Sequence, residues 1–249
     1  MSVGSAKKVR RDRMRRSQSE MEEIENNVEE KLVTNFCSLY FYQFCLGIGV
    51  LQTAWVLTGN VHTIEPFIEM FEWDETDARI YNTLITTSGV LGMAIGTLLS
   101  SRSINKGRRK ATLIWAWPAI IGSFVAQVPL VPSICVGRLL CGLTAGHANT
   151  IMMKATLETV PSKYLGYFKW MSNFYIALGI LFSYSLGDLD LPILPYIGEI
   201  NWRVIYLMPA VFSLLQIIMF GCVYKYEPIA FCIENGRIDE ARLFLKQIY

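Results

Sequence analysis

The chain has 249 residues, of which 52% are hydrophobic and 18% are charged, with a formal net charge of +2 at pH 7. This composition is too apolar and too sparsely charged for an average soluble domain, so a lipid bilayer is the expected solvent. A helix needs roughly 20 mostly apolar residues to cross about 30 Å of hydrocarbon, and windows of that length are therefore the first feature to locate.

Residues 1–31 form a polar tail ahead of the first apolar window, and we expect this tail to be cytoplasmic. Seven basic residues fall within 7–16 and the glutamates within 20–30, while apolar residues recur at helical spacing from Met21 onward. A short amphipathic helix and a disordered tail that touches anionic lipid headgroups both remain open. The acid content argues against a mitochondrial transit peptide, and no apolar core of a signal peptide precedes the first window.

Six windows with little or no charge are long enough to span a bilayer as helices. The predicted spans cover residues 32–58, 80–101, 111–131, 134–157, 167–187 and 203–225. They are continuously apolar, without the alternation of polar and apolar residues that barrel strands show. The sequence therefore predicts an all-α polytopic membrane protein in which residues 32–225 form one bundle. Residues 226–249 would begin a cytoplasmic linker helix, because apolar residues from Ile238 onward share one face.

Basic and acidic residues alternate from one loop to the next. Lys and Arg cluster at 7–16 in the tail and in the loop at 102–110, whereas Asp and Glu dominate the loops at 59–79 and 188–201. By the positive-inside rule, both ends of the chain face the cytoplasm, or the matrix if the membrane is mitochondrial. The basic loop is short and held between two spans, so it cannot lie along a groove of DNA or RNA, and we expect no nucleic-acid partner.

Motifs for catalysis and metal binding are missing from the sequence. There is no H-E-x-x-H, no phosphate-binding glycine loop and no pair of cysteines spaced as C-x-x-C. The six cysteines lie in or beside the spans and are expected to be small apolar fillers. The sequence therefore predicts no enzyme activity, no metal and no cofactor.

Glycines in two of the spans are spaced about one turn apart. Gly92 and Gly96 lie in the second span, and Gly142 and Gly146 lie in the fourth. Small residues at this spacing let helix backbones approach closely in a membrane, where apolar surface alone gives no drive to associate. These glycines predict a densely packed bundle, although they indicate no solute path by themselves.

Five short motifs follow one another in a fixed order. They are the basic G-R-R-K turn at 107–110, GRLLCGLTAG at 137–146, ETVPSKYLG at 158–166, NWR at 201–203 and YEPIAFCIENGRIDEARLFL at 226–245. From about residue 36 to the end, the chain resembles the N-terminal half of a major facilitator superfamily transporter of the sugar porter branch. The resemblance implies a sugar-like polar solute and a second six-helix bundle, either a C-terminal half or a separate chain, or else other membrane subunits as partners.

The resemblance also implies a gate at the cytoplasmic helix ends. In such transporters the two halves rock about a central site, and ion pairs at these ends stabilise one of the two states. The residues at the matching positions are Arg108, Arg109 and Glu158. We expect the carboxylate to meet one of the two arginines in a partly dehydrated cleft.

Several positions depart from the family pattern. Ile104 and Asn105 stand where the family places Asp-Arg, and Leu165 and Ala230 each stand where it places an arginine. Either the gating equilibrium is shifted or the gate is no longer used. Leu51 stands where proton-driven members carry an acid in the first span, so the chain resembles a facilitator more than a symporter.

Recognition of a sugar needs convergent hydrogen-bonding groups and an aromatic face. In the fifth span the family's Q-x-x-x-x-x-G becomes NFYIALG, so Asn173 takes the place of the glutamine. Further candidates, for each of which ordinary packing is the alternative, are Gln43, Gln52, Thr53, His147, Asn149, Thr150 and Tyr175. Arg138 would either line the central cavity or extend to the outer interface.

Two functions of different classes are compatible with these features. The first is facilitative transport of a sugar-like solute, with this chain as one half of the transporter. The second is a structural role, in which a former transporter half serves as a subunit of a larger membrane complex and no longer needs its gate. The same fold would support both functions, so the choice of transport rests on the family resemblance.

Overall fold

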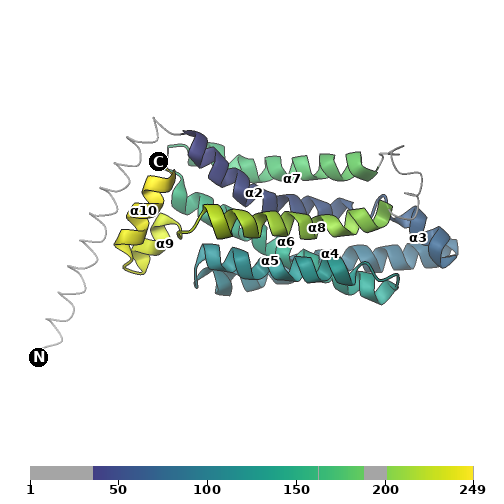
Figure 1. The fold of residues 1–249 in the computed structure, drawn as a ribbon. Helices are drawn as coiled ribbons and strands as arrows, with labels where there is room; N and C mark the ends of the chain where they lie inside the picture. Colours follow the sequence, from purple (N-terminus) through teal and green to yellow (C-terminus); the bar gives the residue numbers. More distant parts are fainter. Residues whose placement is uncertain (1–35, 162, 188–200, 249) are drawn as a thin grey trace, which may run out of the picture.

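The computed structural model describes residues 36–161, 163–187 and 201–248. The predictions for the tail at 1–31 and for the acidic loop at 188–200 lie outside these residues. Every regular element within the described residues is a helix (Figure 1). The predicted all-α fold is therefore confirmed.

Six long helices lie side by side along one direction (Figure 1). They are α2 (Phe36–Thr58), α4 (Glu75–Ile104), α5 (Arg108–Val125), α6 (Val131–Thr159), α7 (Leu165–Gly187) and α8 (Asn201–Ile218), the last extended by a π-helix, η1 (Met219–Val223). Judged by length and composition alone, three described helices, at 37–58, 75–104 and 202–223, are apolar enough to cross a membrane. The sixth span thus includes η1.

The fourth long helix, α6, lies in the interior of the bundle. It packs most extensively against α4 and then against α5 and α2. Two of its polar residues are buried among these neighbours: Arg138 is 5% exposed and His147 is 1% exposed. A helix face covered by protein can carry polar residues that a lipid-facing surface cannot, which explains how α6 accommodates Arg138 and His147.

Four glycines bring the backbones of α4 and α6 into direct contact. A Cβ atom added to any of them would lie closer to a facing carbonyl oxygen than side chains normally come. The pairs are Gly92 with Leu139, Gly96 with Leu143, Gly142 with Gly89, and Gly146 with Met93. The α4–α6 contact therefore depends on the missing side chains of these four residues.

Three short helices cover the two ends of the bundle (Figure 1). At one end is α3 (Ile64–Phe71), which the sequence pattern did not predict, and its buried Phe67 packs on Trp202 and Tyr206. At the other end, α9 (Ile229–Glu234) and α10 (Ile238–Ile248) lie in the segment that was expected to begin a linker helix. They are separate because Gly236 turns the chain between them with φ +72°.

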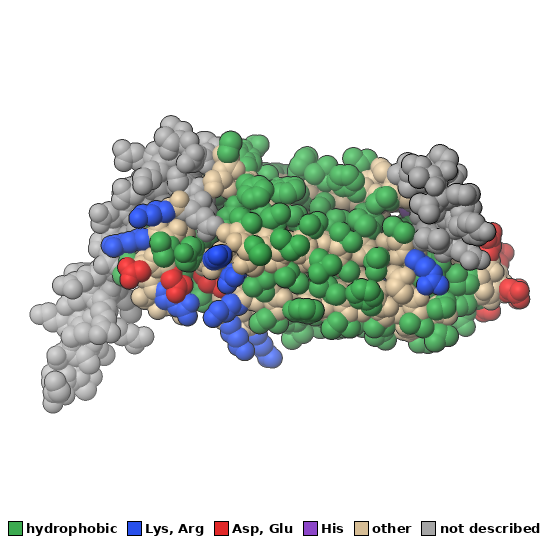
Figure 2. Space-filling model, viewed as in Figure 1, with side chains coloured by type: hydrophobic (Ala, Val, Ile, Leu, Met, Phe, Trp, Pro, Cys, Tyr) green, Lys and Arg blue, Asp and Glu red, His purple; other side chains and the backbone are tan. Residues whose placement is uncertain are grey.

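The face formed by α5 and α8 carries a continuous band of hydrophobic side chains (Figure 2). Most of the Lys and Arg side chains in this view gather at one edge of the band, together with some acidic side chains, and Asp and Glu also gather at the far end of the opposite edge. We call the end with Lys106, Lys110, α9 and α10 the basic end, and the end with Glu65 and Glu69 the acidic end. An apolar band between charged ends is the surface that a bilayer requires.

Candidate functional site

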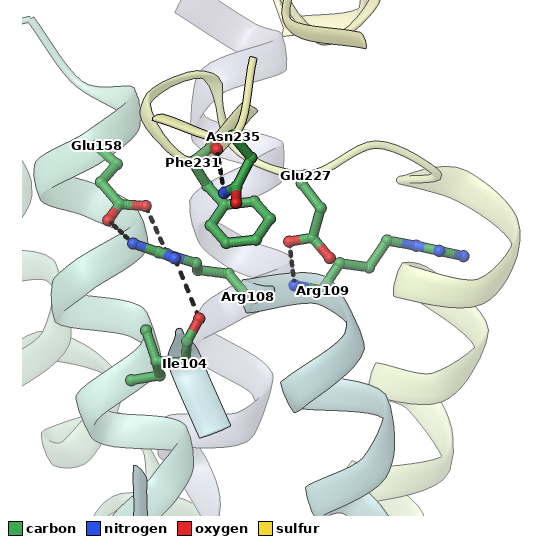
Figure 3. Close-up of polar contacts among 7 residues, drawn as sticks. All are labelled: Ile104, Arg108, Arg109, Glu158, Glu227, Phe231 and Asn235. Carbon is green, nitrogen blue, oxygen red and sulfur yellow. Dashed lines mark hydrogen bonds and ion pairs between the residues drawn. The ribbon is translucent and has the colours of Figure 1, made fainter. Parts of the chain in front are cut away.

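Arg108, the first residue of α5, forms a buried ion pair with Glu158 near the end of α6 (Figure 3). Its Nε donates to Glu158 Oε2 at 2.8 Å, and its Nη2 donates to the other carboxylate oxygen. Its Nη1 donates to the Ile104 carbonyl at 3.1 Å, and the guanidinium carbon lies 4.7 Å from the centroid of the Phe231 ring. The side chains of Arg108 and Glu158 are only 5% and 11% exposed, so this two-pronged pair is held away from water.

Arg109 extends away from Glu158 (Figure 3). Its Nε donates to the carbonyls of Phe220 at 2.7 Å and of Tyr224 at 2.9 Å. These carbonyls belong to the π-helix and the residue that follows it, where a helix end leaves acceptors without partners. Of the two arginines expected to meet Glu158, the structure joins only Arg108 to it, while Arg109 ties α5 to the end of α8.

Glu227 caps the beginning of α5 and was not singled out from the sequence. It is 4% exposed and accepts hydrogen bonds from the backbone N–H groups of Arg109 at 2.8 Å and Lys110 at 3.2 Å. Such N-terminal amides lack partners within their own helix and favour a negative charge. Gly107 has φ +129°, and a Cβ atom there would lie 2.6 Å from the Glu227 carboxylate. The sequence signal for this cap was an acid placed shortly after an apolar span.

Apolar or neutral side chains occupy the positions where the family pattern has charges. Ile104 is 2% exposed within the main apolar core, and Leu165 packs against the same core. Asn105 is exposed and Ala230 is half-buried. Within the cluster at the basic end, Arg108 is therefore paired with Glu158, whereas Arg109 is bound to neutral carbonyls.

Cys232 of α9 lies against this cluster and is fully buried. Its thiol donates to the Glu227 carbonyl at 3.4 Å. Burial, together with the nearby charges of Glu240 and Glu227, raises the pKa of the Cys232 thiol to about 11. The thiol therefore stays protonated at neutral pH and behaves as an apolar filler. Among the described residues, no group of three or more His, Cys, Asp or Glu side chains is placed to hold a metal ion.

Gln43 and Gln52 of α2 are each buried with half of their amide satisfied. Gln43 Oε1 accepts from the Thr156 hydroxyl at 2.9 Å, while Gln52 Nε2 donates to the Ser213 hydroxyl at 2.6 Å. Within the described part of the chain, Gln43 Nε2 and Gln52 Oε1 have no hydrogen-bond partner. Buried amides seldom leave such groups unpaired. Gln43 Nε2 can therefore donate a hydrogen bond to a water molecule or a polar solute, and Gln52 Oε1 can accept one.

Three other candidates are already bonded or packed inside the bundle. Thr53 donates to the Ala145 carbonyl at 3.3 Å, and Thr150 donates to a carbonyl of its own helix at 3.0 Å. The His147 ring stacks on Trp115 with 4.5 Å between centroids and lies within hydrogen-bond distance of the Ser103 hydroxyl. These contacts within the bundle involve no solute, so Thr53, Thr150 and His147 each have a structural role.

The remaining candidates lie along the contact between α7 and its neighbours. Asn149 of α6 accepts from the Ser172 hydroxyl of α7 at 3.1 Å, and Asn173, the next residue along, is exposed. Tyr175 is 4% exposed and packs against Gly47 of α2. The candidates therefore do not converge on one pocket: Asn149 and Asn173 lie at the α6–α7 edge, whereas Gln43, Gln52 and Thr53 point into the bundle.

Arg138 is buried in the half of the bundle nearer the acidic end. Its Nε donates to the Ile85 carbonyl at 3.1 Å, and its Nη2 donates to the Val56 carbonyl. The guanidinium carbon lies 5.6 Å from the centroid of the Tyr206 ring. Because the residue is 5% exposed, its side chain does not extend to the outer interface, and that alternative is wrong.

Comparison with known proteins gives matches at the levels of family, sequence and fold. The family model described as "Sugar (and other) transporter" matches residues 55–249. Hexose transporter 1 of Toxoplasma gondii is 28% identical over 179 residues, which are 68% of this chain and 32% of the relative. Myo-inositol transporter 3 of Cryptococcus neoformans is 30% identical over 172 residues, which are 67% of this chain and 27% of the relative. The chain thus spans about a third of the length of these relatives.

Among solved structures, the xylose transporter XylE from E. coli in a partially occluded inward-open conformation superposes with a TM-score of 0.70. The aligned region covers 83% of this chain and 52% of XylE at 19% identity. The structure of XylE bound to 6-bromo-6-deoxy-D-glucose superposes with a TM-score of 0.73 and covers 86% of this chain and 50% of XylE. At this identity the likeness concerns the fold alone.

Proposed function

Since the chain belongs to the Sugar (and other) transporter family, we propose that it moves a sugar-like polar solute across a membrane. The chain is a multi-pass integral membrane protein with the fold of one half of a major facilitator superfamily transporter. It would act by alternating access as an N-terminal half, and the second bundle would be a C-terminal half or a separate chain. The family match over residues 55–249, which include most of the spans, carries this proposal.

The basic end is proposed to face the cytoplasm. Lys106, Lys225 and Lys110 in the first turn of α5 lie at this end, whereas Glu65 and Glu69 of α3 lie at the acidic end. The positive-inside rule supports this orientation. The short helices α9 and α10 would then lie on the cytoplasmic side, and α3 would lie on the opposite side.

Arg108, Arg109 and Glu158 are proposed as the cytoplasmic gate. The support is that the Arg108–Glu158 pair joins the start of α5 to the end of α6 in a site largely shielded from water. Arg109 supports the same contact by holding the end of α8. A solute-driven rearrangement of these helix ends would have to accommodate or break this pair, which is how an ion pair biases one of two states.

Asn173 is proposed as the first contact of the solute, with Gln43 and Gln52 as further polar groups. Asn173 is exposed beside the Asn149–Ser172 bond, and the two glutamines keep one free amide group each among the described residues. The names of the relatives, hexose and myo-inositol transporters, support a polyhydroxylated solute. No Asp or Glu occurs between Leu32 and Ile64, which supports facilitated diffusion over proton coupling.

Solute uptake tests this function directly. The purified protein, with any subunit that copurifies, would be reconstituted into liposomes and supplied with labelled glucose, xylose or myo-inositol. We expect uptake above that of empty vesicles, and a loss of about tenfold in the Asn173→Ala variant through the missing hydrogen bonds. Thr83→Ala is the control, because this exposed hydroxyl bonds only to its own helix at the Arg79 carbonyl. Uptake by the unaltered protein equal to that of empty vesicles would reject transport.

A structural subunit is the second candidate function. The observation that favours it is the apolar core around Ile104, because the family pattern places an acid at this position and uses it at the gate. Such a subunit would copurify with unrelated membrane proteins and show no uptake with any of the three labelled solutes. Copurification with a second six-helix bundle, together with uptake, would exclude this alternative.

A further inference from the structure

Lys110 and Lys225 are fixed at one corner of the basic end, although they belong to different elements. The backbone N–H of Lys110 donates to Glu227, two residues after Lys225. The side chain of Arg109, the residue before Lys110, donates to the carbonyl of Tyr224, the residue before Lys225. The same pair of contacts therefore holds the backbones of both lysines beside each other.

Positive charges outnumber negative ones at this corner, where Glu227 is the nearby acid. The side chains of Lys110 and Lys225 are exposed, and neither forms an ion pair within the residues that the structure describes. The nearby Glu227 is 4% exposed, and both of its carboxylate oxygens are occupied by backbone N–H groups of α5. Arg109 adds a third charge that is bound only to neutral carbonyls. The corner therefore presents cationic groups that can bind an anion.

An exposed apolar surface begins directly beside these lysines. Ile114, one helical turn beyond Lys110 in α5, is 66% exposed. On the antiparallel neighbour α8, Ile218 is 52% exposed, and Val223 at the end of η1, just before the corner, is 40% exposed. Figure 2 shows the resulting arrangement, in which Lys and Arg side chains gather at the edge of the apolar band over α5 and α8.

We propose that this corner binds an anionic phospholipid, with the phosphate of the headgroup between Lys110 and Lys225. The acyl chains lie along the apolar surface of α5 and α8 that starts at Ile114 and Ile218. The adjoining apolar surface distinguishes a lipid from a free phosphate ion, which would gain nothing from it. Because α5 and α8 both contribute to the corner, the bound lipid holds the two helix ends together beside the Glu227 cap.

Binding of labelled phosphatidylglycerol to the full chain in detergent micelles tests this site. Each lysine near a membrane surface contributes about fivefold to the affinity for an anionic lipid, so the Lys110→Gln/Lys225→Gln variant is expected to bind about thirtyfold more weakly. The control variant is Lys163→Gln/Lys169→Gln, which removes two exposed lysines at the same end, one just before α7 and one in its first turns. The control is expected to bind as the unaltered protein does, and Lys110→Arg/Lys225→Arg is expected to retain most of the affinity.

Competition then separates a lipid from other anions. Unlabelled phosphatidylglycerol is expected to displace the labelled lipid, whereas phosphatidylcholine and free glycerol phosphate are not. An equal loss of affinity in the control variant, or no loss in the Lys110→Gln/Lys225→Gln variant, would overturn the proposal. Displacement by glycerol phosphate at similar concentrations would reassign the corner to a soluble anion. A melting curve of each variant in phosphatidylcholine micelles shows whether that variant is folded. If the Lys110→Gln/Lys225→Gln variant is unfolded, the binding of the folded Lys110→Arg/Lys225→Arg variant still tests the proposal.

Discussion

Replacing Glu158 with glutamine is expected to destabilise the basic end of the bundle by about 3–5 kcal/mol. The guanidinium of Arg108 cannot lose its proton, and its side chain is only 5% exposed in the structure. Without the carboxylate, a full positive charge would remain buried with only the Ile104 carbonyl and a glutamine oxygen as acceptors. The free energy of unfolding in detergent, measured with a chemical denaturant, is the observable.

An exposed pair of the same chemistry supplies the control for Glu158. Glu75 and Arg79 form an ion pair one turn apart in α4, with side chains 84% and 78% exposed. Glu75→Gln is expected to cost at most about 0.5 kcal/mol, because water screens this pair. The double variant Arg108→Gln/Glu158→Gln is expected to be more stable than Glu158→Gln, since no uncompensated charge remains. Similar losses for Glu158→Gln and Glu75→Gln would contradict the burial of the pair.

Gly96→Val is expected to separate α4 from α6 and to cost about 3 kcal/mol or more. The Cβ atom alone would meet the carbonyl group of Leu143, and this obstacle is backbone that cannot rotate away. Because α4 and α6 form the most extensive helix pair of the bundle, the loss should lower the melting temperature of the whole protein. Melting in detergent, followed by fluorescence or by the amount of monodisperse protein, measures the effect.

Gly166→Val is the matched control in α7. A Cβ atom at Gly166 would meet nothing within 4 Å, so valine there should leave the melting temperature nearly unchanged. Gly146→Val, on the α6 side of the same contact, should reproduce the loss because its Cβ atom would meet the Met93 carbonyl. Equal melting temperatures for Gly96→Val and Gly166→Val would contradict the close contact between α4 and α6.

The bundle was predictable from the sequence, whereas its end structures were not. Each helix could be predicted from its own apolar window of bilayer length, without knowledge of its neighbours. Small residues such as Gly92 and Gly96 indicated where two helices can approach closely. The helix α4 begins at Glu75, before the apolar window at 80–101, because its first charged turn extends beyond the apolar band. Nothing in the apolar pattern marks the short helix α3, whose position depends on a contact between Phe67 and Trp202.

The contacts of the polar candidate residues were harder to predict from the sequence than the helices were. The residue types Arg108 and Glu158 indicated an ion pair, but choosing between Arg108 and Arg109 required the position of η1, which supplies carbonyls to Arg109. His147 could be read as a solute contact or as packing until Trp115 of another helix was found stacked on it. Contacts between distant segments decide such cases, and a single sequence does not contain them.

The central claim is that this chain is a membrane-spanning transporter half whose basic end is cytoplasmic. The most direct test is to determine on which side of the membrane each end of the bundle lies. In a variant whose exposed cysteines Cys37 and Cys222 are replaced by serine, one new cysteine would be introduced at Glu69 or at Lys106, both of which are exposed. A membrane-impermeant maleimide added to intact cells should label Glu69→Cys at once and Lys106→Cys only after permeabilisation, if the chain resides in the plasma membrane. In another membrane, sealed vesicles of known orientation give the same comparison. Labelling of both positions from the same side of the membrane would contradict the claim.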